Sequence, residues 1–70
     1  MFDYAKLRAI TVERGKTGAD VAVAAGMAPA TYSGKLNGRN DFTQSEIAAI
    51  VGFLKINPAD IAVYFFTEKV

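Results

Sequence analysis

The sequence of 70 residues contains no cysteine and no histidine. Without cysteine the chain has no disulfide bonds and no thiolate metal ligands, and without histidine it lacks the commonest metal ligand and acid–base catalyst. A chain this short also has little material to wall the deep pocket in which an enzyme holds its substrate. We therefore expect a binding module rather than an enzyme, with no catalytic residues, no metal site and no cofactor.

Long apolar runs are also missing, although 51% of the residues are hydrophobic. No run approaches the ~20 apolar residues that cross a bilayer. A signal peptide is not expected, because charged residues interrupt the N-terminal segment, namely Asp3, Lys6, Arg8, Glu13 and Arg14. Eight Lys and Arg against seven Asp and Glu give a formal net charge of +1. These features predict a soluble cytoplasmic protein without a membrane partner, with residues 1–70 forming one domain.

Helix-breaking residues divide the chain into five short helical candidates, and the period-two alternation of strands is nearly absent. Gly15 and Gly26 are predicted to stop the first two helices, and Pro29 fits the first position of the third, where its missing N–H is harmless. Thr17 is the expected N-cap of the second helix. The sequence therefore predicts an all-α fold whose first three helices cover Asp3–Arg14, Gly18–Ala25 and Pro29–Leu36.

The fourth helix has the clearest start signal in the chain, Thr43-Gln44-Ser45-Glu46. The Thr43 hydroxyl can accept from the Glu46 N–H while the Glu46 carboxylate accepts from the Thr43 N–H, which is a capping box. Asn57 and Pro58 then cap and start a fifth helix. Apolar residues at helical spacing are expected on the inner faces of these two helices, and they are Ile47, Ile50, Val51, Leu54, Ile61, Tyr64 and Phe65.

Residues 17–32 have the pattern of a helix, a tight turn at Gly26 and a second helix. Ala22 is small at the position where the two helices would cross closely, and Gly26 supplies the backbone freedom of the turn. Tyr32 and Leu36, four residues apart, share one side of the second helix. We expect this side to be buried against Val21, which leaves the opposite side of the second helix exposed.

Four further segments carry a resemblance to a known family: Met-Phe-Asp-Tyr-x-Lys-Leu-Arg at the N-terminus, residues 35–38, residues 42–47 and the Tyr64-Phe65-Phe66 run. Together with the helix-turn-helix pattern they resemble the Cro and CI-like, or XRE-type, proteins of the phage repressor class. The resemblance covers nearly the whole chain and is greatest to short phage or prophage proteins of Gram-positive hosts. It implies a lambda-repressor-like helix-turn-helix domain with the motif at about residues 17–36.

The resemblance also implies where DNA would bind. The third helix, residues 29–36, would lie in the major groove of the duplex as the recognition helix, with the preceding helix across the phosphate backbone. Ala30, Ser33 and Gly34 would occupy the base-facing positions, with Pro29 beside them. Phosphate-facing residues would be Thr17, Gly18, Thr31, Asn37, Arg39 and Asn40.

The charge pattern of residues 27–40 agrees with such a surface. This segment holds two cations, Lys35 and Arg39, and no carboxylate. Lys35 is either a phosphate contact or a side chain that lies over the core beside Leu36. A single domain with two to four phosphate contacts binds DNA weakly, so we expect a homodimer on paired half-sites of double-stranded operator DNA.

Several positions depart from the family pattern. Gly18 stands where the family usually has a glutamine that binds phosphate, and Ala28 has no side-chain acceptor to cap the recognition helix, a loss of roughly 1 kcal/mol. Ala30 and Gly34 cannot make the bidentate base contacts that long polar side chains make. Val12 and Val23 are apolar where the helical pattern predicts outward-facing positions.

The Tyr64-Phe65-Phe66 run is the second unusual feature. Successive helical residues point about 100° apart, so a short helix cannot hide three consecutive aromatic side chains on one side. At least one is expected to remain exposed or to contact a second chain. We predict a dimer interface here, formed by Val63, Tyr64, Phe65, Phe66 and Val70, with packing under the first and fourth helices as the alternative.

The leading hypothesis is therefore a sequence-specific DNA-binding transcriptional regulator, a Cro-like phage repressor that acts in the bacterial cytoplasm. The alternative is an antirepressor or modulator, which keeps the helix-turn-helix fold but binds a phage repressor protein. The near-zero net charge, the alanines of residues 28–30 and the two outward valines motivate this alternative.

Overall fold

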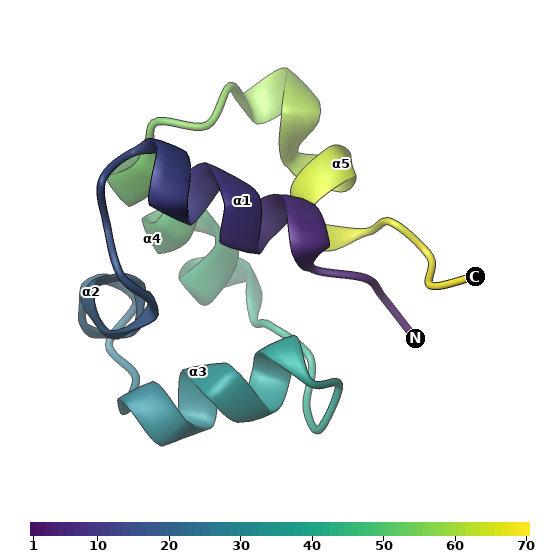
Figure 1. The fold of residues 1–70 in the computed structure, drawn as a ribbon, viewed down its shortest axis with the longest axis horizontal. Helices are drawn as coiled ribbons and strands as arrows, with labels where there is room; N and C mark the ends of the chain where they lie inside the picture. Colours follow the sequence, from purple (N-terminus) through teal and green to yellow (C-terminus); the bar gives the residue numbers. More distant parts are fainter.

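The computed structural model describes residues 1–70 and contains five α-helices and a short 3-10 helix (Figure 1). This confirms the predicted all-α fold with five helices, a fold compatible with a small helix-turn-helix protein. The elements are α1 (Ala5–Glu13), α2 (Gly18–Ala24), α3 (Pro29–Leu36), α4 (Gln44–Leu54), η1 (Pro58–Asp60) and α5 (Ile61–Phe65).

The helices surround one small core. In Figure 1, α1 partly covers α4, α2 is seen end-on, and α3 runs along the lower edge of the molecule. The stripe of α4 supplies Ile50 and Leu54, which are fully buried, while Ile47 and Val51 are half-buried. The buried hydrophobic residues are Tyr4, Leu7, Ile10, Val21, Ala22, Tyr32, Ile50, Leu54, Ile56 and Phe65.

Side-chain caps fix where α2 and α4 begin. The predicted capping box of α4 is confirmed, since the Glu46 N–H donates to Thr43 Oγ1 at 3.2 Å and the Thr43 N–H donates to Glu46 Oε1 at 2.8 Å. Thr17 caps α2 as expected, and Asp20 completes a second capping box that the sequence analysis did not identify. These bonds satisfy N–H groups that a helix N-terminus otherwise leaves unpaired.

The turn between α2 and α3 depends on Gly26. Its φ of +74° lies in the left-handed region, which glycine adopts without steric cost. The Met27 N–H donates to the carbonyl of Ala22 at 2.8 Å, which closes the C-terminal end of α2. Ala22 itself is fully buried, as the predicted close crossing requires.

The two chain ends pair with each other, which the sequence analysis did not predict. Phe2 and Glu68 form an isolated antiparallel bridge. The Asp3 N–H donates to the Thr67 carbonyl at 2.7 Å and the Lys69 N–H donates to the Met1 carbonyl at 2.8 Å. We call residues 1–3 and 67–69 the terminal ribbon.

No helix of this protein has both the length and the hydropathy that a membrane-spanning helix requires.

The start of α3 carries a stability prediction. Ala28 is its N-cap, has extended backbone angles and makes no side-chain cap bond. Ala28→Ser should raise the free energy of unfolding by about 1 kcal/mol, because the new hydroxyl can accept from an N–H of the first turn. This corresponds to a rise in Tm of about 4–8 °C for a domain of this size, measurable by circular dichroism. Ala30→Ser, an exposed substitution inside α3, is the control, and equal stability of the two variants would contradict the expected cap.

Candidate nucleic-acid interface

The outer side of α3 is uncovered. Pro29, Ala30, Thr31 and Ser33 are exposed on this helix, and no other element lies below it in Figure 1. All four are among the residues predicted to face DNA. Their side chains are short, so a ligand can approach the helix backbone closely along this side.

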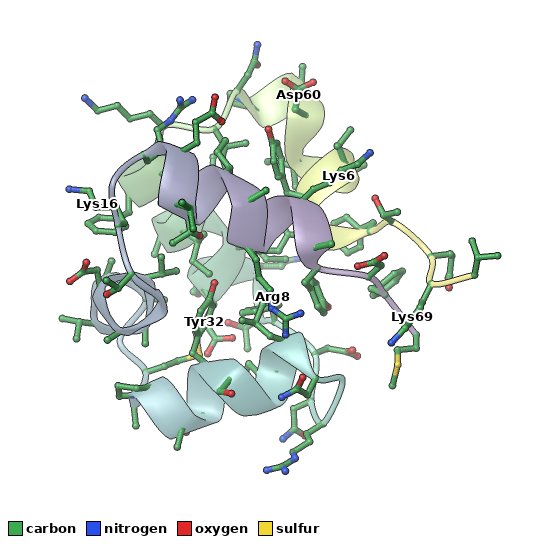
Figure 2. The ribbon with its side chains drawn as sticks, in the orientation of Figure 1. Lys6, Arg8, Lys16, Tyr32, Asp60 and Lys69 are labelled. Carbon is green, nitrogen blue, oxygen red and sulfur yellow. The ribbon has the colours of Figure 1, made fainter.

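Tyr32 is the residue that holds α3 against the rest of the protein. Figure 2 shows its side chain extending from α3 into the space between α2 and α4, and the residue is buried. Burial raises the pKa of the Tyr32 hydroxyl, an effect that the neighbouring Thr11 side chain and the Arg8 guanidinium oppose. Tyr32 is therefore a core residue, as predicted, and its position turns the opposite side of α3 outward.

Gly34 is covered by Arg39 and does not offer an open surface for a base. A Cβ at Gly34 would lie 3.4 Å from Cδ and 3.9 Å from Cβ of Arg39. The Arg39 N–H also donates to the Gly34 carbonyl at 2.9 Å. The expected base-facing role of Gly34 is thus corrected. The missing side chain of Gly34 allows the stem of Arg39 to lie on α3.

Lys35 points inward instead of toward a phosphate. Its Nζ donates to Glu46 Oε1 at 2.6 Å, and the side chains of both residues are largely buried. The ammonium also lies 5.9 Å from the ring centroid of Phe42. The sequence allows two positions of Lys35, one on a phosphate and one over the core beside Leu36. The structure shows the position over the core, where the ammonium is paired with Glu46 and is not available to DNA.

The loop after α3 is exposed at Asn37, Arg39 and Asn40, as predicted for phosphate contacts. The structure adds Arg8 of α1, whose Nη2 donates to Asn37 Oδ1 at 3.4 Å. Figure 2 shows Arg8 extending from α1 toward the C-terminal half of α3. Arg8 is not among the site residues predicted from the sequence, because no local pattern predicts a contact between residues 29 positions apart.

The N-terminus of α2 is less favourable for phosphate than the resemblance implies. Thr17 and Gly18 are exposed, but the Thr17 N–H donates to Asp20 Oδ2 at 2.9 Å, and the Asp20 N–H donates to Thr17 Oγ1 at 3.1 Å. Hydrogen bonding to the Asp20 carboxyl, first from the Thr17 backbone N–H and then from the Thr17 side chain, lowers the pKa of this carboxyl and keeps it charged. A phosphate at Gly18 would therefore approach a carboxylate.

The aromatic run near the C-terminus is divided between core and surface. Phe65 is buried inside its own chain, Tyr64 is half-buried and Phe66 is 49% exposed. This confirms that at least one of the three remains exposed, and it removes Phe65 from the surface available to a second copy. Val63 and Val70 are exposed as well.

An apolar groove of about 280 Å³ adjoins Phe66 and includes Phe2, Phe42 and Ile47 among its lining residues. Phe2 and Phe66 meet edge to face, with ring centroids 5.5 Å apart. The groove thus connects the terminal ribbon to the first turn of α4.

Comparison with known proteins gives a family without an assigned function. No curated protein matches the chain. Residues 1–68 match the family model described as "Protein of unknown function (DUF739)". Because this match covers nearly the entire sequence, the chain is a member of the DUF739 family.

Proposed function

We propose that this protein is a transcriptional regulator that binds double-stranded operator DNA in the bacterial cytoplasm, with α3 in the major groove. The observation that carries the proposal is the uncovered outer side of α3. A helix side that no other element covers and that carries short side chains fits the major groove, which is wide enough to admit an α-helix. The Cro-like resemblance of the sequence supports the same role.

The distribution of charge supports this orientation. With Lys35 neutralised by Glu46, Arg39 and Arg8 are the cations beside the outer side and the C-terminal end of α3. No carboxylate occurs between residues 27 and 40. These cations would bind phosphates on either side of the groove and set the register of the helix on the duplex.

Sequence selectivity would come from small side chains. Ala30 can contact a thymine methyl group, and the hydroxyls of Thr31 and Ser33 can donate or accept at a base edge or a phosphate. None of these residues makes a bidentate base contact, which is worth about 1–3 kcal/mol of discrimination. The protein would therefore discriminate weakly as one copy and needs two copies on adjacent half-sites.

We infer that the second copy binds through the exposed apolar side chains of α5 and the following segment, Val63, Phe66 and Val70, with Tyr64 at the edge. The apolar groove beside Phe66 provides a complementary surface. A two-fold arrangement would bury the same patch on both subunits.

A titration of labelled duplex DNA tests the proposal. Promoter DNA beside the protein's own gene should bind at micromolar protein in low salt, and log K should fall linearly with log salt. Arg39→Gln should weaken binding roughly tenfold and reduce this salt slope by about 0.9 for each phosphate that the variant no longer neutralises. Lys55→Gln removes a charge at the C-cap of α4, away from α3, and is the matched control. Absence of binding by the unmodified protein would contradict the proposed function.

A second candidate function rests on two exposed valines. Val12 on α1 is 75% exposed and Val23 on α2 is 73% exposed. A phage repressor that packed on these residues would make this protein an antirepressor. Co-purification with the repressor encoded beside it would support this function, whereas a stable DNA complex formed without any partner would count against it.

A further inference from the structure

We propose that the terminal ribbon carries a further contact to the DNA backbone, made by the ammonium of Lys69 together with the guanidinium of Arg8. The proposal rests on the proposed DNA-binding function and extends the interface beyond the helix-turn-helix segment. The contact is to a phosphate of the same duplex that α3 binds, at the C-terminal end of α3.

One small hollow brings the relevant groups together. It has a volume of about 100 Å³, and Arg8, Asn37 and Lys69 are among the residues that line it. These three belong to α1, to the C-cap of α3 and to the terminal ribbon. In Figure 2, Lys69 lies beside the N-terminal segment, and Arg8 extends toward α3 from the underside of α1. The hollow therefore joins the chain ends to the surface assigned to DNA.

Neither Arg8 nor Lys69 forms an ion pair with a carboxylate. The two ion pairs of the protein use other cations, the Met1 amine with Glu68 at 3.6 Å and Lys35 with Glu46. Asp3 also lines the hollow, and its Oδ1 accepts from the Ala5 N–H at 2.8 Å. A phosphate beside Arg8 and Lys69 would thus meet two cations and one carboxylate, and this excess of positive charge favours its binding.

The backbone of Lys69 is connected to the loop after α3 through Met1. Its N–H donates to the Met1 carbonyl at 2.8 Å. The Met1 side chain in turn lies against Gly38, where an added Cβ would be 2.6 Å from Cε of Met1. Gly38 has a φ of +84°, which lies in the left-handed region that favours glycine. The ribbon and the loop therefore pack directly on each other, and a duplex bound at Asn37 and Arg39 lies close to the ribbon.

DNA titrations over a range of salt concentrations test this contact. Lys69→Gln should weaken binding roughly eightfold at about 0.1 M salt and lower the salt slope by about 0.9, the value for one phosphate. The loss should be the same for different DNA sequences, because phosphate contacts carry no base information. Lys69→Arg should restore affinity and slope, and Lys55→Gln should leave both unchanged. Circular dichroism confirms that each variant is folded.

The outcomes separate this inference from the proposed function. If the unmodified protein does not bind duplex DNA, both fail. If it binds and Lys69→Gln matches Lys55→Gln in affinity and slope, the Lys69 contact is wrong while the function of α3 stands. If Lys69→Gln weakens binding without reducing the salt slope, Lys69 has a structural role, and the proposed phosphate contact is equally overturned.

Discussion

Replacing Phe42, which is half-buried and packs against the core, by alanine should lower the free energy of unfolding by about 3 kcal/mol, the lower end of the range for loss of a large aromatic side chain. Phe42 lies between α3 and α4 and contacts three other aromatic rings. Its ring centroid is 5.3 Å from that of Tyr4, 5.6 Å from that of Phe65 and 5.9 Å from that of Tyr32. Loss of this ring therefore weakens the attachment of α3, of the N-terminal segment and of α5 at once.

Urea denaturation followed by circular dichroism measures this effect. A domain of this size has a total stability of roughly 4–10 kcal/mol, so Phe42→Ala should unfold at a much lower urea concentration than the unmodified protein. Phe42→Leu keeps most of the apolar volume and should cost less than about 1.5 kcal/mol. A midpoint for Phe42→Ala equal to that of the unmodified protein would show that the aromatic cluster does not hold α3 in place.

Replacing Lys35 by methionine should lower the free energy of unfolding by about 1.5–3 kcal/mol, the range for hydrogen bonds to charged groups. Lys35 Nζ and Glu46 Oε1 are 2.6 Å apart, in a site where both side chains are largely buried. Methionine preserves the stem of the side chain, so the variant isolates the loss of the ammonium. Lys35→Arg keeps the charge and is the matched comparison in the same denaturation experiment.

The pH dependence of stability tests the same ion pair. The hydrogen bond from Lys35, and after it the bond from the Thr43 N–H, lower the pKa of the Glu46 carboxyl below its ordinary value of 4.5. A carboxyl with a lower pKa in the folded state contributes stability above its unfolded pKa and loses it as the pH falls through the folded pKa. The protein should therefore lose stability below about pH 4.5.

Glu46→Gln should lose less stability over this acidic range than the unmodified protein, because position 46 no longer titrates. Part of the acid sensitivity should remain, since Asp20 also has a lowered pKa. Denaturation midpoints measured between about pH 6 and pH 3 give the comparison. If the denaturation midpoints of Glu46→Gln and of the unmodified protein fall equally with pH, Glu46 and Lys35 do not interact in solution.

Local signals in the sequence predicted most of the helical architecture. Thr43 and Glu46 are three residues apart, so their capping box depends only on one turn of backbone. This capping box is present in the structure. The ends of α3 likewise follow from Pro29 at its start and from the polar loop after Leu36. The first helix was predicted too long, because Asp3 does not begin α1. Its Oδ1 accepts from the Ala5 N–H, and its own N–H pairs with Thr67.

Contacts between distant residues account for the parts of the candidate site that the sequence analysis missed. Lys35 and Glu46 are 11 residues apart and belong to different helices, so the inward direction of Lys35 depends on how α3 packs beside α4. The stem of Arg39 covers Gly34 only because the loop turns back over α3. The pairing of Phe2 with Glu68 joins opposite ends of the chain. Helical periodicity carries no information about such contacts.

Mapping the surface that contacts DNA by NMR tests most directly whether α3 is the DNA-binding element. Duplex DNA from the adjacent promoter would be added to the 15N-labelled protein and the backbone amide shifts followed. The largest changes are expected at residues 30–34 and 37–40, with α5 changing only where a second copy binds. Saturating duplex that leaves these amides unchanged, or shifts only residues 61–66, would contradict the DNA-binding role of α3.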